Sequence, residues 1–196
     1  MEDFVGTASE TSTRVHVGEK EAFRLLGEQP ETGPLVSFLR LYVASECKDL
    51  FSIHIRDWHP RDDPEFERYG EHCVAGSEGA RFVWDRWLSI PENGRHFPIH
   101  SRRLNLFAEG ILPGLLRFLL HREDPLSVRF GVIGVTTNIK IFNICEGLMD
   151  YLEARQVAVC SELTASTSVR NHFKGLDDLE SRLGVKVLER VAEFRK

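Results

Sequence analysis

The sequence predicts a three-layer α/β/α domain of Rossmann type with a mostly parallel sheet. Apolar, β-branched runs alternate along the chain with segments that carry apolar residues at helical spacing. This alternation is typical of parallel strands that are joined by helices. The runs at 51–55 and 128–135 are nearly continuous in apolar residues, as expected for strands that are covered on both faces.

The first half of the chain contains one clear helix between short strands. Residues 14–17 are a short strand candidate. Residues 35–46 have apolar side chains at helical spacing, and Gly33-Pro34 before them suits a helix start. The other candidates are a strand at 49–55, a short strand or flap at 82–87 and a strand at 96–100.

The second half of the chain has the stronger periodicity. Residues 104–121 predict a long helix that Pro113-Gly114 kinks or breaks. A buried strand at 128–135 leads into a helix at 138–155, for which Asn138 is the expected cap. The remaining elements are a strand at 157–160, a helix at 169–183 and a strand at 185–188.

Composition indicates one ordinary globular domain. The chain has 196 residues, of which 42% are hydrophobic and 28% charged. Residues 1–13 are polar and small, so we expect a flexible N-terminal segment followed by a single domain over 14–196. A net charge of -5 and a pI near 5.9 give no electrostatic reason for a nucleic-acid partner.

Cysteine usage and hydropathy favour a cytoplasmic protein without a membrane partner. The 4 cysteines form no CxxC pair and no disulfide-framework spacing, so we expect free thiols. There is no apolar run of about 18 residues and no N-terminal signal with a basic start and an apolar core.

A carboxylate and two imidazoles mark the end of the 49–55 strand. Asp57 and His59 are two residues apart, so both side chains fall on one face of the strand end, and His72 returns after a polar loop. Ligands bind at the carboxyl ends of strands in open α/β sheets. Imidazole and carboxylate are ligands of divalent transition metals. We therefore predict that Asp57, His59 and His72 bind one divalent ion, Zn, Fe or Mn. The alternative is that Asp57 and His59 only cap the next turn.

This stretch resembles a known family. Asp57-Trp58-His59-Pro60, His72-Cys73 and Gly76-Ser77-Glu78-Gly79-Ala80 are similar to the DWHP, HC and G-T-x-G-A motifs of the isochorismatase-like cysteine hydrolases, most closely the nicotinamidases. Residues 129–137 and 158–166 resemble that family's later strands, and 176–187 its last helix and strand. The resemblance implies the isochorismatase-like fold, metal binding by Asp57, His59 and His72, and a homo-oligomer.

The catalytic groups of that family do not carry over by position. Its acid, amine and thiol fall on Gly18, Ser101 and Lys140, so we predict no catalytic residue. If the first segment is shifted in register, Glu19 or Glu21 stands at the acid position instead. We expect negligible hydrolysis of nicotinamide by thiol chemistry.

Two functions remain open. In the first, the protein is a non-hydrolytic relative that keeps a metal and a small-molecule pocket, to which we assign Trp58, Thr136 and Lys140. Lys140 would bind an anionic ligand there; the alternative is that it neutralises a nearby acid or faces solvent. In the second, the protein is a metal-dependent hydrolase of a small amide or related C–N substrate. Its base would be a carboxylate of the loop: Asp62, Asp63 or Glu65.

Other side chains receive weaker assignments. His54 is expected in the core or an interface, because alternation places it on the face opposite Asp57. The aromatic segment 82–88 is expected either at an oligomer interface or as a flap over the metal site. Four histidines without partner spacing are expected at the surface: His96, His100, His121 and His172.

Overall fold

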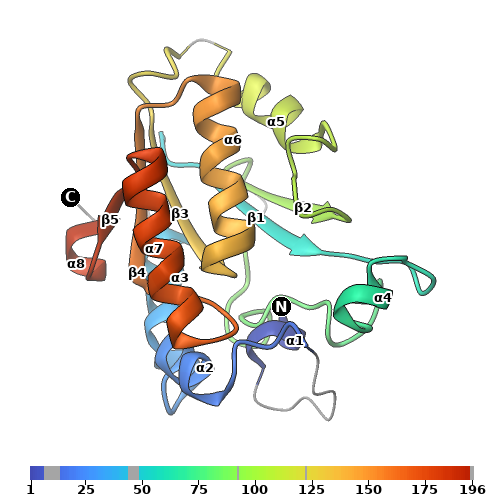
Figure 1. Cartoon of the computed structure of the whole chain (residues 1–196). Helices are drawn as coiled ribbons and strands as arrows, with labels where there is room; N and C mark the ends of the chain where they lie inside the picture. The colour runs from blue at the N-terminus through green and yellow to red at the C-terminus, as the bar shows by residue number, and fades with distance from the viewer. Residues whose placement is uncertain (7–13, 44–48, 92, 122, 195–196) are drawn as a thin grey trace. The chain divides into compact units, whose positions relative to one another are not determined.

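The computed structural model describes residues 1–6, 14–43, 49–91, 93–121 and 123–194 (Figure 1). The chain divides into two compact units, Met1–Arg102 and Arg103–Lys196. The predicted α/β class is confirmed, since strands alternate with helices and the paired strands of the described residues are all parallel. A single domain over 14–196 stays a prediction.

Unit 1 is built on one parallel strand pair. Strands β1 (Ser52–Asp57) and β2 (His96–Ser101) pair in register from Ser52 with His96 to Asp57 with Ser101. Both strands were predicted within a few residues. The helices of this unit are α1 (Glu2–Val5), α2 (Glu19–Leu26), α3 (Pro34–Val43) and α4 (Phe66–Tyr69), with a 3-10 turn at Pro30–Thr32.

The start of the chain differs from the prediction. Residues 1–6 include helix α1, in which Glu2, Asp3, Phe4 and Val5 are buried, and a flexible segment over 1–13 stays a prediction. Residues 14–17 form a turn and irregular backbone rather than a strand, and the Val17 N–H donates to the Phe4 carbonyl at 2.9 Å. Residues 82–87 form turns rather than a strand. Residues 7–13 and the end of the helix predicted at 35–46 lie outside the described residues.

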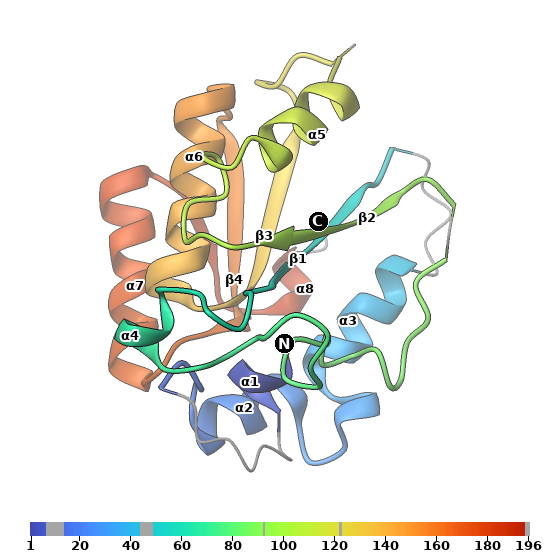
Figure 2. The ribbon, with the colours of Figure 1, turned by 90° about the vertical axis from the view of Figure 1, so that its right-hand side faces the viewer.

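Unit 2 contains a parallel sheet of order β3-β4-β5. Its strands are β3 (Arg129–Val135), β4 (Gln156–Ala165) and β5 (Lys186–Leu188). Figures 1 and 2 show α6 and α7 side by side on one face of this sheet. The helices are α5 (Ile111–Leu119), α6 (Phe142–Leu152), α7 (Val169–Leu183) and α8 (Val191–Phe194).

Local sequence signals explain where these helices begin and end. The prediction for α7 is confirmed at both ends: Ser168 Oγ accepts the Asn171 N–H at 3.1 Å, and Gly184 ends the helix in the left-handed region. The helix predicted at 104–121 begins only at Ile111. Gly110, with φ 80°, precedes it, and Pro113 lies in its first turn, where a missing N–H costs nothing.

A π-helical turn, Thr137–Ile141, connects β3 to α6. Asn138 lies inside this turn and is not the helix cap that was predicted. Its Oδ1 instead accepts a hydrogen bond from Ser166 Oγ. The turn therefore replaces the start of the helix predicted at 138–155, and Lys140 belongs to it.

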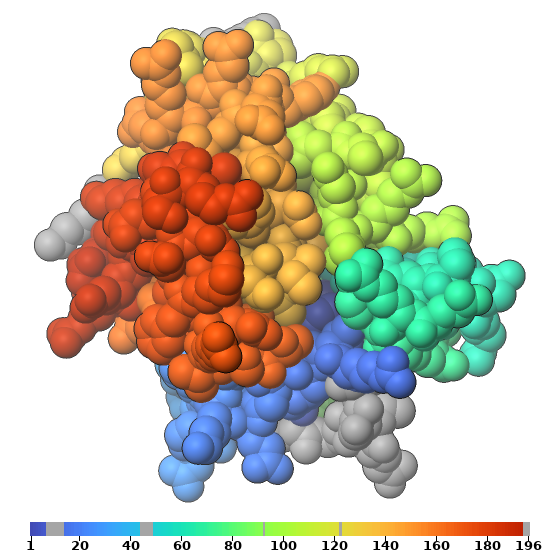
Figure 3. Space-filling view, in the orientation of Figure 1, coloured from blue at the N-terminus to red at the C-terminus, as the bar shows by residue number. Residues whose placement is uncertain are grey.

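The outer side of α7 forms part of the surface in the space-filling view (Figure 3). Among the described residues, none of the helices has the length and apolar character needed to cross a membrane.

Candidate metal centre

Asp57 is the last residue of β1 and faces the unit's interior, where it is 6% exposed. Its neighbour across the strand pair is Ser101, the last residue of β2. The chain stays extended beyond β1, because the Trp58 N–H donates to the Ser101 carbonyl at 2.8 Å. Because side chains of an extended chain alternate between its two faces, His59 points inward like Asp57.

A short backbone bridge brings His72 back to this strand end. The His59 N–H donates to the Cys73 carbonyl at 3.0 Å, and the Ala75 N–H donates to the His59 carbonyl at 2.8 Å. The imidazole centroids of His59 and His72 are 4.8 Å apart. One ligand atom from each of Asp57, His59 and His72 lies within 4.8 Å of the other two. The loop thus brings the three predicted ligands together.

Hydrogen bonds orient both imidazoles. The Nδ1 of His72 lies 2.7 Å from the Gly70 carbonyl, which only accepts, so Nδ1 carries the proton. The Nδ1 of His59 lies 3.1 Å from Asp63 Oδ2 and donates to that carboxylate. Each ring therefore presents the lone pair of Nε2, the tautomer that a metal ligand needs. Within the described part of the chain, the buried Nε2 of His59 has no hydrogen-bond partner.

The two imidazoles are buried, and aromatic rings pack against them. His59 is 1% and His72 2% exposed. The Phe66 ring packs edge-on against both, at 5.6 Å from each centroid, and Phe4 packs against His72. Such burial costs free energy for polar groups that lack partners, which a bound cation would supply.

Asp63 remains a carboxylate in this setting. Burial alone would raise its pKa, but hydrogen bonds from the Glu65 N–H and from His59, with the charge of Arg102, lower the pKa below its ordinary value. A second possible ligand group consists of His59, Asp63 and Glu65. The first group is better formed, because both oxygens of Asp63 already accept hydrogen bonds.

Helix α1 supports the loop that carries His72, a role that the sequence did not reveal. Asp3 Oδ2 accepts the Cys73 N–H at 2.7 Å, and the Asp3 N–H donates to the Gly79 carbonyl at 3.1 Å. A Cβ at Gly79 would lie 2.1 Å from Asp3 Oδ2, so this contact requires glycine. The available signal was the apolar pair Phe4-Val5 beside two acids in an otherwise polar segment.

The positions that correspond to the family's catalytic groups are altered, as the sequence shows. Gly18 precedes α2 with φ 86° and follows irregular backbone instead of a strand, and its match to the acid position stays a prediction. Of the alternatives, Glu21 is buried in an ion pair with Arg24 at 2.7 Å. Ser101 is fully buried at the end of β2.

Lys140 is buried rather than exposed to solvent. It is 8% exposed, and its Nζ donates to the Arg103 carbonyl at 2.6 Å within unit 2. Thr136, also buried, begins the same turn. Trp58 belongs to unit 1, so a pocket shared by Trp58, Thr136 and Lys140 stays a prediction.

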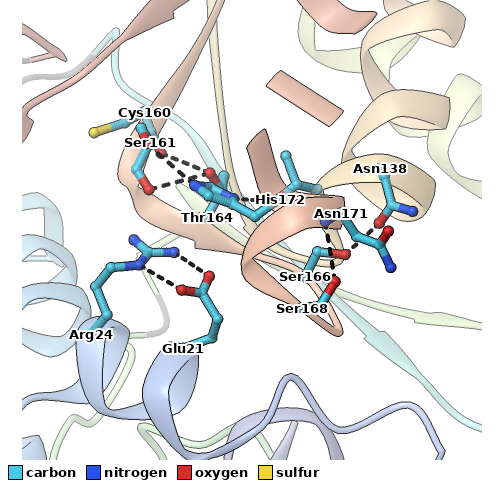
Figure 4. Close-up of polar contacts among 11 residues, drawn as sticks. Glu21, Arg24, Asn138, Cys160, Ser161, Thr164, Ser166, Ser168, Asn171 and His172 are labelled. Atoms are coloured by element: carbon cyan, nitrogen blue, oxygen red, sulfur yellow. Dashed lines mark hydrogen bonds and ion pairs between the residues drawn. The ribbon is translucent and has the colours of Figure 1, made fainter. Parts of the chain in front are cut away.

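His172 corrects the expectation of a surface histidine. It is 1% exposed, with Nδ1 at 2.9 Å from Thr137 Oγ1 and Nε2 at 3.3 Å from Ser161 Oγ (Figure 4). It thereby ties α7 and β4 to the π-helical turn. His96 is also partly buried, against His54.

Burial suppresses the reactivity of two described cysteines. Cys73, Cys145 and Cys160 are all buried. Burial raises the pKa of Cys145 to about 12 and raises that of Cys160. Since the thiolate is the reactive form, neither of these two thiols is activated.

Searches with the sequence find no matching family model and no significantly similar curated protein. Solved structures do match. A nicotinamidase/pyrazinamidase from Bacillus subtilis has a TM-score of 0.70 at 17% identity, covering 96% of this chain and 94% of its own. An isochorismatase-like hydrolase from Alkaliphilus metalliredigens has a TM-score of 0.66 at 23% identity, and the match covers 100% of this chain and 92% of that protein. The pyrazinamidase of Pyrococcus horikoshii, in complex with zinc, has a TM-score of 0.57 at 21% identity, and the match covers 71% of this chain and 75% of that protein. The chain therefore has the fold of the isochorismatase-like hydrolases and nicotinamidases.

Proposed function

We propose that this protein is a non-hydrolytic relative of the isochorismatase-like hydrolases that binds a divalent transition metal, zinc above all, and a small molecule. The observation that carries the metal proposal is the orientation of the two imidazoles. Each has its Nδ1 proton engaged by a fixed acceptor, which leaves Nε2 for an ion near the Asp57 carboxylate. The zinc complex of a protein with the same fold supports this choice.

Asp57, His59 and His72 would hold the ion. When bound, it would supply a Lewis acid at the carboxyl ends of β1 and β2. The residues around it hold protons in place: the Gly70 carbonyl fixes the tautomer of His72, and the Asp63 carboxylate that of His59. Phe4 and Phe66 exclude water from the rings.

The absence of thiol hydrolysis is proposed from the altered positions. The family's nucleophile corresponds to Lys140, whose ammonium donates to the Arg103 carbonyl. An acyl-enzyme step by thiol chemistry needs a thiolate with a base beside it. Ser101 offers a neutral hydroxyl where the family has an amine, and Gly18 offers no side chain at all.

Zinc titration of the metal-stripped protein by calorimetry, with nicotinamide hydrolysis followed in parallel, tests both parts. We expect one zinc per chain, weakened at least about tenfold by His72→Ala, and no turnover with or without zinc. His121→Ala, at an exposed histidine, is the matched control and should bind like the parent. Zinc binding that ignores His72→Ala would contradict the metal site. Nicotinamide turnover that thiol alkylation abolishes would contradict the loss of thiol chemistry.

The alternative is a metal-dependent hydrolase of a small amide or related C–N substrate. Glu65 favours it, because its carboxylate belongs to the group around His59 and is only half-buried. Asp63 is committed to two hydrogen bonds. Amide hydrolysis that requires zinc and is lost in Glu65→Gln would establish this alternative.

A further inference from the structure

A groove of about 340 Å³ opens on the face of β1 that points away from Asp57. Alternation along the strand puts Arg56 and Trp58 on this face. The groove is lined by Arg56, Trp58, Gly76, Ser77, Arg81 and Asp85. Its volume lies at the lower end of the range for small-molecule sites.

The guanidinium of Arg56 is held rigidly at this groove. Its Cζ lies 4.1 Å from the Trp58 ring centroid and 5.2 Å from that of Phe82. Its Nη2 donates to His100 Nε2 at 2.9 Å. Burial, and then the charge of Arg56, lower the pKa of His100, so the imidazole is neutral and accepts this bond. The cation is thus held by rings from Trp58 directly after β1, from β2 and from the segment that follows Ala80.

This fixed cation lacks a carboxylate partner among the described residues. The Nε of Arg56 is buried without a hydrogen-bond partner. Among the described residues, the Arg56 side chain makes one hydrogen bond, from Nη2 to His100 Nε2. Burial lowers the pKa of Arg56 and the charge of Asp85 opposes this shift, but no ion pair joins the two. Guanidinium groups in partly dry sites bind oxyanions through two parallel N–H bonds.

The remaining lining residues define the charge and shape of a ligand. Ser77 Oγ accepts the Ala80 N–H, which leaves its hydroxyl proton for a ligand. Gly76 offers bare backbone, with open space where a Cβ would be. Arg81 lies at the rim, paired with the exposed Glu78 at 3.0 Å. Two guanidinium groups stand against the Asp85 carboxylate and, at the rim, Glu78, so the lining has no surplus charge to compensate a dianion and suits a monoanion better.

We propose that this groove is a binding site for a small monocarboxylate, whose oxygens Arg56 and Ser77 bind and whose charge Arg81 complements. The site is separate from the metal centre, because it lies on the opposite face of β1. It does not depend on the proposed function.

Calorimetric titration of the full chain with benzoate, benzamide and inorganic phosphate tests this site. We expect one benzoate per chain, no measurable binding of neutral benzamide, and phosphate weaker than benzoate. Ser77→Ala and Arg81→Gln should each weaken benzoate binding by about three- to tenfold. Arg56→Lys keeps the charge but loses the two parallel N–H donors of the guanidinium, so it should weaken benzoate binding by about tenfold or more.

Two controls establish whether benzoate binds in this groove. Arg170→Gln removes the same charge from an exposed position of α7 and should leave benzoate binding unchanged. Stripping the parent protein of metal with a chelator should leave it unchanged too, which distinguishes the groove from carboxylate binding on a metal. Loss of benzoate binding on metal removal, equal binding of benzamide, tighter binding of phosphate, or full affinity in both Ser77→Ala and Arg81→Gln would each overturn the proposal. If Arg56→Lys does not fold, Ser77→Ala and Arg81→Gln decide the matter.

Discussion

Asp63 determines which nitrogen of His59 carries the proton. Its carboxylate is held by the Glu65 N–H at 3.0 Å and in turn holds the Nδ1 proton of the imidazole at 3.1 Å. Partners of this kind around metal-ligating histidines strengthen metal binding by fixing ring orientation and raising ligand basicity.

We therefore expect Asp63→Asn to weaken zinc binding by about 10- to 100-fold. The amide in Asp63→Asn would keep the shape of the side chain but lose the negative charge. Its NH₂ group could also take the place of Oδ2, the oxygen that accepts the Nδ1 proton of His59. Competition with a chromophoric zinc chelator measures the affinity. Asp62→Asn, at the exposed neighbouring position, is the matched control and should bind zinc like the parent. Equal affinity in both variants would show that Asp63 does not support the site.

At the residue scale, spacing predicted that Asp57, His59 and His72 converge but not which groups orient them. Asp57, His59 and His72 follow from a strand end and a loop that must return. Asp63 was predicted only as a base, because nothing in sequence tells whether a loop carboxylate faces a histidine or solvent. The buried contact between Thr137 and His172 joins residues 35 apart in the chain and is a tertiary feature that no local pattern encodes.

Strand β1 separates two environments. Asp57 lies on the face of the candidate metal site, whereas His54 and Arg56 lie on the other face. His54 is buried there, 3.4 Å from His96 and against Trp84. Burial, and then the charge of His96, lower the pKa of His54 from 6.5 to about 4.

This shift makes unit 1 sensitive to acid. Between pH 6.5 and about 4 the unfolded chain binds a proton that folded His54 refuses, so stability should fall as the pH falls through this window. At 1.36 kcal/mol per pKa unit, the loss reaches about 3 kcal/mol at the acid end. The free energy of unfolding, measured in urea at a series of pH values, should depend less steeply on pH in His54→Gln than in the parent. His121→Gln, at an exposed histidine, should keep the parent slope, and an unchanged slope in His54→Gln would contradict the prediction.

Helix α7 approaches the π-helical turn closely at Gly175. A Cβ there would lie 2.8 Å from the backbone nitrogen of Asn138. Gly175→Ala should therefore displace the turn that carries Lys140 and destabilise the protein by about 1–3 kcal/mol in urea unfolding. Gly114→Ala is the control, because a Cβ at Gly114 of α5 meets open space. It should be neutral or stabilising by up to about 1 kcal/mol.

For the whole molecule, the prediction of self-association remains to be measured. Large apolar side chains are exposed within both units, among them Phe23 at 61%, Phe118 at 69% and Phe173 at 60%. Single exposed apolar side chains are also normal on monomers, so the expectation rests on the family resemblance described above. We expect a dimer or larger closed assembly of 22.4 kDa chains at micromolar concentration. Light scattering measures the mass, and a monomer mass would refute the prediction.

The fold as a class was predictable because period and alternation are properties of each segment alone. The strands at 96–101 and 129–135 and helix α7 followed from apolar patterning and capping. The N-terminal helix was not predictable, since α1 has only four residues and owes its position to Asp3 and to its packing under the loop of His72. For 82–87 the sequence left a strand and a flap open, because it does not show that these aromatic side chains pack around Arg56 and His54 instead of extending a sheet.

The backbone bridge at His59 also bears on how an ion would enter. Bringing the ends of a loop together costs entropy, and here the bonds among His59, Cys73 and Ala75 have already closed the loop between the two histidines. An arriving ion would therefore meet a preassembled chelate and would not have to order the chain around itself. Zinc binding should therefore follow a single phase whose observed rate constant rises linearly with zinc concentration. A slower first-order phase from refolding of the loop should not appear.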